Sequence, residues 1–188
     1  MMLRIKTILE GPRILPAKSW VAVVVMLSLM AAACGRDDDI AVAIGRQLEF
    51  VATSPQVAER VVFTDGLGRT RVLRPRASNR QLAVVDIIVV NRSTTVVSLL
   101  LNEAAVELGD RRSDRLEAID PFIADVPEGK VDERGAIVLE ENPLWGEVEI
   151  NKGFQISGWF VFDVPKGLIL GTVWWNQADT VSLDFIEY

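Results

Sequence analysis

The most constraining feature of this chain is the run of residues 81–91, QLAVVDIIVVN, in which nearly every position is apolar. Most of these apolar residues are valine or isoleucine, whose branched side chains favour an extended backbone. A strand with one exposed face alternates apolar and polar residues, whereas this one is apolar on both faces. We therefore expect residues 81–91 to form a strand that lies at the centre of a sheet or is covered on both faces.

Shorter segments of β type occupy much of the remaining chain and are separated by turns rich in glycine, proline and asparagine. Residues 60–64 and 69–73 flank Asp65-Gly66-Leu67-Gly68, which predicts a hairpin. No convincing long helix interrupts the series, and this pattern is typical of a β-sandwich or a β-barrel. The other predicted strands are residues 47–53, 94–101, 104–108, 136–139, 147–150, 158–164, 168–175 and 180–187.

The N-terminus has the pattern of an export signal. Four basic residues precede an uncharged segment of 15 residues (19–33), which ends in Ala32 and Ala33 just before Cys34. A secretory signal combines a basic start, a short apolar core and small residues at the cleavage site. Because a membrane-spanning helix needs about 20 apolar residues, this segment is better suited to cleavage than to spanning. An uncleaved anchor helix, with Cys34 incidental, is the alternative.

The residues before Cys34 resemble the lipobox of bacterial lipoproteins, in which a cysteine after two small residues is acylated and becomes the first residue of the mature protein. Ala32 and Ala33 match this pattern, whereas Ala31 stands where leucine is usual. The resemblance implies a signal peptide over 1–33 and a lipid-anchored spacer over 34–45, followed by one domain over 46–188. It implies an extracytoplasmic protein that is anchored to the cell membrane through acyl chains at Cys34.

Composition excludes several classes of function. The chain contains no histidine and a single cysteine. Catalytic triads that include histidine are therefore excluded, and so are metal sites with imidazole ligands. Residues 1–33 carry four of the 20 Lys and Arg and one of the 26 Asp and Glu, which leaves the remainder with a net charge of −9. Such an acidic domain is unsuited to binding nucleic acid. We expect no cofactor and no catalysis.

Two motifs resemble those of a known family. Asp86 within its strand, followed by Asn91-Arg92-Ser93, is similar to a VDVxVxN-x-S/T pattern, and residues 158–165 (GWFVFDVP) are similar to G-x-L-V-F-D/E-V-P. The order of these motifs resembles a family of bacterial extracytoplasmic lipoproteins with a domain of unknown function, related to a secreted immunoprotective antigen fold. The resemblance implies an immunoglobulin-like antiparallel β-sandwich in the all-β class. It implies no enzymatic activity.

Asp86 is the one charged residue in the apolar run. A carboxylate placed there is costly unless it is hydrogen-bonded or paired with a cation. The favoured interpretation is a structural carboxylate bound to loop N–H groups or to an arginine. The alternative is an acid or ligand whose pKa is perturbed.

Trp174 and Trp175 are neighbours on a predicted strand, so their rings should point to opposite faces. One is expected in the core, and the other is a candidate binding platform that stacks on a sugar or on an aromatic group of a partner. Packing within the sandwich is the simpler interpretation of both.

Residues 109–135 form a charged segment that breaks the β pattern, with a short helix predicted over residues 113–119. Carboxylates from such loops often bind calcium, so Asp110, Asp114 and Asp120, with Asp125, are candidate metal ligands. Their spacing fits no EF-hand, and the arginines between them favour a solvated loop laced with ion pairs.

These observations favour a lipoprotein whose domain binds a protein or an envelope component. One alternative is a carbohydrate-binding module that uses an exposed tryptophan. Another is a hydrolase with carboxylates only, which needs two carboxyl groups about 5–10 Å apart in a cleft.

Overall fold

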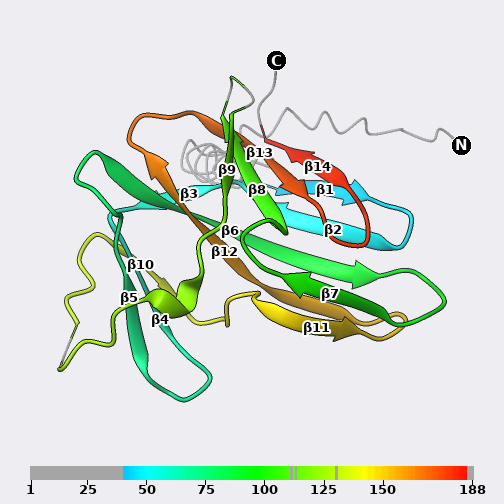
Figure 1. Cartoon of the computed structure of the whole chain (residues 1–188), viewed down its shortest axis with the longest axis horizontal. Helices are drawn as coiled ribbons and strands as arrows, with labels where there is room; N and C mark the ends of the chain where they lie inside the picture. Colours follow the sequence, from blue (N-terminus) through cyan, green and yellow to red (C-terminus); the bar gives the residue numbers. More distant parts are fainter. Residues whose placement is uncertain (1–39, 111, 113, 130, 186–188) are drawn as a thin grey trace, which may run out of the picture. The chain divides into compact units, whose positions relative to one another are not determined.

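The computed structural model describes residues 40–110, 112, 114–129 and 131–185. The predicted signal peptide (1–33) and Cys34 lie outside these residues. Within the described part, all regular structure is β apart from one short 3₁₀ turn, η2 (Pro121–Ile123), and the strands form open sheets (Figure 1). No helix among the described residues is long and apolar enough to cross a membrane. The prediction of an all-β, mainly antiparallel sandwich is confirmed.

A central sheet organises the fold, with the strand order β1-β2-β6-β12 and β3 paired to the same edge of β6 as β2. Every pair in it is antiparallel. Its strands are β1 (Ile40–Ile44), β2 (Leu48–Thr53), β3 (Gln56–Ala58), β6 (Arg80–Asn91) and β12 (Gln155–Pro165).

Two smaller sheets contribute to the core on one face of the central sheet. One pairs β7 (Val97–Leu101) with β11 (Gly146–Ile150); the other has the order β14 (Val181–Asp184), β13 (Leu170–Trp175), β8 (Val106–Asp110), β9 (Arg115–Glu117). Alternate residues of β6, such as Val85 and Ile87, point into this core. The Trp175 ring lies 5.0 Å from that of Phe50 and 6.2 Å from that of Phe160. These contacts lie in the first layer interface of the sandwich, called here the main core.

A third sheet covers part of the opposite face of the central sheet. It contains β10 (Ala136–Leu139), β4 (Arg60–Thr64) and β5 (Thr70–Leu73), with β10 parallel to β4. Leu82 and Val84 of β6 are buried with Trp159 in a second core, where the Trp159 ring lies 4.9 Å from the Phe63 ring. The first half of β6 is therefore buried on both faces, as its sequence predicts.

The cover provided by the third sheet stops at the middle of β6. Beyond Val84, the side chains of Asp86, Ile88 and Val90 on the same face are only half-buried. On the edge strand β1, Ile40 is 59% exposed and Ile44 is 71% exposed, although both point to this face of the sheet. The central sheet thus has a half-face that no other described part of the chain covers, called here the open face.

Two predicted boundaries differ from the structure. The range 34–45, predicted as a spacer, includes β1, because Ala41 is buried in the main core and β1 pairs along its length with β2. The helix predicted over residues 113–119 is absent from its described residues, which instead contain β9. Pairing with β8 determines this outcome, since Leu116 lies opposite Leu108 and packs on the main core.

Candidate binding site

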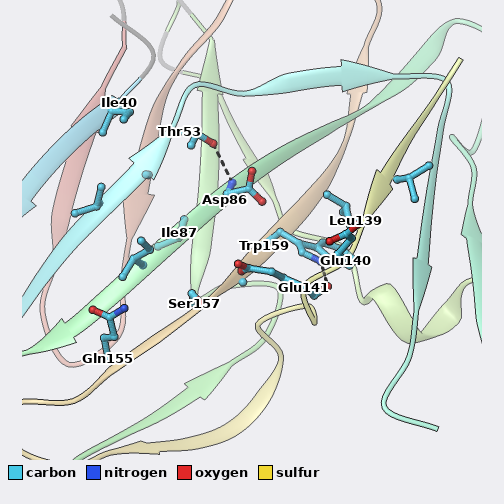
Figure 2. A pocket seen from close by; sticks show the side chains of 15 residues that line it. Ile40, Thr53, Asp86, Ile87, Leu139, Glu140, Glu141, Gln155, Ser157 and Trp159 are labelled. Atoms are coloured by element: carbon cyan, nitrogen blue, oxygen red, sulfur yellow. Dashed lines mark hydrogen bonds between the residues drawn. The ribbon is translucent and has the colours of Figure 1, made fainter. Parts of the chain in front are cut away.

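A hollow of about 600 Å³ lies on the open face, where the third sheet ends (Figure 2). Its apolar lining includes Val51, Ile88, Val138 and Trp159. Its carboxyl groups come from Asp86 on β6 and from Glu140 and Glu141, which follow β10. The other lining residues are Ile40, Ala52, Thr53, Ile87, Leu139, Gln155, Ser157 and Gly158. None of the described lining residues carries a positive charge.

The wall of the hollow is held by the close approach of residues 141–144 to β12. The Leu144 N–H donates to the Trp159 carbonyl over 3.1 Å, and the indole Nε1 of Trp159 donates to the Glu141 carbonyl over 2.8 Å. Gly158 permits this approach, because a Cβ there would lie 2.4 Å from the Asn142 carbonyl oxygen. Trp159 therefore fixes the backbone of Glu141 while its ring packs under the third sheet.

Asp86 lies at the border between the second core and solvent. Its backbone N–H donates to the Thr53 hydroxyl over 3.3 Å (Figure 2). Burial is the main cause that raises the pKa of its carboxyl group, and the charge of Glu141 adds to the effect, whereas a hydrogen bond with the Thr53 side chain opposes it. Among the described residues, the Thr53 side chain is the hydrogen-bonding partner of this carboxylate, in place of the arginine or loop N–H groups expected from the sequence.

The two adjacent tryptophans have different surroundings. Trp175 is fully buried in the main core, and its indole N–H donates to the Gln177 carbonyl over 2.6 Å. Trp174 points to the other face and lies against Gly109, where an added Cβ would be 2.1 Å from its ring. The Arg115 guanidinium sits 4.4 Å from the centre of the Trp174 ring. Because Arg115 occupies that ring face, Trp174 is not an open platform for stacking.

Three of the four candidate metal ligands have separate local roles for their carboxylates. The Asp110 carboxylate accepts from the N–H groups of Arg112 and Asp114, the Asp120 carboxylate accepts from the N–H of Phe122, and Asp125 pairs with Arg74. Among the described residues, no group of three or more potential ligands is suitably placed to hold a metal ion. The carboxylates of Asp110 and Asp120 therefore close turns, and that of Asp125 forms an ion pair.

The hollow could not be located from local sequence patterns. Asp86 was recognisable as an isolated charge, but Glu140 and Glu141 carry no special motif and reach the site only because β10 pairs with β4. The available signal was the GWFVFDVP motif, whose Gly158 and Trp159 hold the wall in place.

Comparison with known proteins gives little further information. No family model matches the chain, and no curated protein matches it significantly. Among solved structures, the chain is similar to the yjhA protein from Bacillus subtilis, with a TM-score of 0.45 and 12% sequence identity. The match covers 72% of this chain and 78% of that one.

Proposed function

We propose that this chain is an extracytoplasmic lipoprotein, anchored to the cell membrane at Cys34, whose β-sandwich binds a protein or envelope partner at the hollow without catalysis. The observation that carries the binding role is the open face itself. The described residues leave a sheet face lined by Val51, Ile88 and the exposed Ile40 uncovered beside three carboxyl groups. Uncovered apolar surface that adjoins polar groups is typical of interaction sites.

The anchor and the hollow are close along the chain. Only six residues lead from Cys34 to Ile40, which lines the hollow, so the extended chain between them spans at most about 20 Å. Lipidation at Cys34 would therefore keep the hollow near the bilayer surface. The partner we expect is one presented at that surface, such as another envelope protein.

Two measurements test this proposal in the native host. Intact mass and membrane partitioning of the wild type and of Cys34→Ser test the anchor; we expect an acylated mass and loss of the variant from the membrane fraction. A photo-crosslinking amino acid at Ser157, in the hollow, tests the binding surface. The matched control places it at Leu67, 76% exposed at the β4–β5 turn.

We expect Ser157 to give one discrete adduct that is lost in the Cys34→Ser background, and Leu67 to give none. An unprocessed mass with Cys34→Ser still in the membrane would contradict the anchor. Equal adducts from both positions, or none from Ser157, would contradict the hollow as the binding surface.

A carboxylate-only hydrolase is the second candidate, because the structure brings Asp86 and Glu141 to one hollow and raises the pKa of Asp86. General acids in such enzymes need a raised pKa. Hydrolysis of a panel of chromogenic glycosides and esters, compared with Asp86→Asn, tests it. Turnover that disappears in the variant would support the hydrolase and overturn the non-catalytic proposal.

A further inference from the structure

The hollow is bordered by a strand edge with no partner among the described residues. β10 is the outer strand of the third sheet, with β4 on one side only, and Val138 and Leu139 of β10 line the hollow. The backbone groups on the free side of an edge strand are ready to pair with another extended chain. Recognition by addition of a strand uses such an edge, with side-chain pockets that provide specificity.

The surface beside this edge has a definite chemistry. The floor is apolar, with Val51, Ile88 and Val138, and Val138 itself is 51% exposed. Asp86, Glu140 and Glu141 surround this floor with no cation among the described lining residues. The complement of such a surface is an extended segment that presents both apolar and basic side chains.

Charge also favours a peptide over the lipid bilayer as the occupant of the hollow. Three consecutive aspartates, Asp37 to Asp39, directly precede Ile40, and the chain after Cys34 is strongly acidic. This acidic surface would repel anionic lipid headgroups. Such headgroups attract basic protein segments, not acidic ones.

We propose that the hollow binds an extended basic peptide segment, which adds a strand to the free edge of β10 and places its cationic side chains beside Glu140 and Glu141. This inference rests on the proposed function, since it names the chemistry of the partner at the same hollow. Apolar side chains of the segment contact Val138 and the floor of the central sheet. The partner is thus a protein with an exposed, lysine- or arginine-rich strand or tail.

The test uses the full-length chain in neutral detergent micelles and a fluorescent peptide in which lysine and valine alternate. We expect saturable binding that weakens as the salt concentration rises. A glutamate–valine peptide should not bind. A lysine–valine peptide with N-methylated backbone should bind at least about tenfold more weakly, because it lacks the N–H groups that pair with a strand edge.

Variants locate the binding site. The double variant Glu140→Gln, Glu141→Gln should weaken the lysine–valine peptide by about tenfold. The matched control is Glu147→Gln, Glu149→Gln on β11, two exposed glutamates outside this hollow, which should leave affinity unchanged. Unaltered thermal unfolding of both variants shows that the fold is retained.

Several outcomes would overturn the inference: no binding of the lysine–valine peptide, equal binding of its N-methylated form, or equal loss in both double variants. Binding of spermidine with the affinity of the peptide would show that charge alone is recognised. Preferential binding to phosphatidylcholine vesicles would identify the face as a lipid contact. If these tests fail while crosslinking from Ser157 still yields its adduct, the partner chemistry is wrong and the proposed function stands.

Discussion

Asp86 and Trp159 lie directly opposite each other on the paired strands β6 and β12, and they mark the point where the third sheet stops covering the central sheet. On one side of this pair, Val84 and Val161 are buried in the second core. On the other side, Ile88 and Ser157 line the hollow. The same tryptophan that closes the core also holds the Glu141 backbone, so the packing of the core and the shape of the hollow depend on each other.

Replacing Asp86 with asparagine should stabilise the protein at neutral pH. Burial raises the pKa of this carboxyl group in the folded state, so ionising it opposes folding. The advantage of Asp86→Asn is absent below the ordinary carboxyl pKa of 3.8 and grows as the pH rises through the higher folded-state pKa. Because the side chain is half-exposed, we expect a gain below about 1 kcal/mol.

Urea unfolding of the wild type and of Asp86→Asn across the acidic and neutral range measures this effect. Thr64→Val, at an exposed position on β4, controls for a general response to a surface change. A variant less stable than the wild type at neutral pH would show that the carboxylate has a stabilising partner.

For Asp65 we expect the opposite dependence of stability on pH. Its buried carboxylate accepts hydrogen bonds from Arg71 over 2.8 Å and from the N–H groups of Leu67 and Arg69, and these bonds lower the pKa of the group. A carboxyl group whose pKa is lowered by folding stabilises the folded state at pH values above its unfolded-state pKa. This stabilisation is lost as the pH falls toward the folded-state pKa. Asp65→Asn should therefore lower the Tm at neutral pH by roughly 5 °C or more.

Thermal unfolding as a function of pH checks this. The difference in Tm between the wild type and Asp65→Asn should shrink as the pH falls below about 4, because the unfolded wild type then binds a proton that the folded carboxylate, with its lowered pKa, does not bind. Asp132→Asn is the matched control, since Asp132 makes similar bonds to Arg134 at an exposed site. An equal effect of both substitutions would contradict a special role for the buried pair.

Local patterns predicted the strands well but not how far each is covered. The run of residues 81–91 is apolar on both faces, and its first half is buried on both, yet nothing in the run indicates that the third sheet ends before Asp86. The extent of cover is determined by residues 136–141, through the parallel pairing of β10 with β4. Parallel pairing joins segments distant in sequence, so no local periodicity records it.

The helix predicted over residues 113–119 shows a second limit. Its described apolar residues, Leu116, Ala118 and Ile119, have spacings compatible with a helical face as well as with a strand. Tertiary contacts determine that the segment forms a strand, since β9 pairs with β8 and Arg115 covers Trp174. Short segments with balanced local preferences follow the sheet beside them.

The adjacent tryptophans should differ strongly in their contribution to stability. Trp175→Ala removes a fully buried ring that contacts Phe50 and Phe160, and we expect a loss of about 3–5 kcal/mol. Trp174→Ala removes a half-buried ring and its contact with Arg115, with a loss of about 1 kcal/mol. Urea unfolding measures both changes in the free energy of unfolding.

The pair also tests the carbohydrate-binding alternative. Polysaccharide pull-down with the wild type, Trp174→Ala and Arg115→Ala should show no binding in any of them. If Arg115→Ala exposes the Trp174 ring and creates binding that Trp174→Ala abolishes, Arg115 is a cover over a sugar platform.

Gly158→Ala should damage the hollow and the core together. The added Cβ would approach the Asn142 carbonyl oxygen to 2.4 Å and the Leu144 side chain to 2.9 Å, so residues 141–144 must move away from β12. Displacement of backbone by overpacking costs about 1–3 kcal/mol. The movement also displaces Glu141, whose carbonyl accepts from the Trp159 indole N–H, so both the stability and the binding of the lysine–valine peptide should decrease.

Gly66→Ala is the control, because an added Cβ there meets no atom within 4 Å. Chemical unfolding, followed by tryptophan fluorescence, measures the change in the free energy of unfolding. An unchanged free energy of unfolding in Gly158→Ala would mean that residues 141–144 move without cost. The shape of the hollow would then depend on β10 and not on the close approach at Gly158.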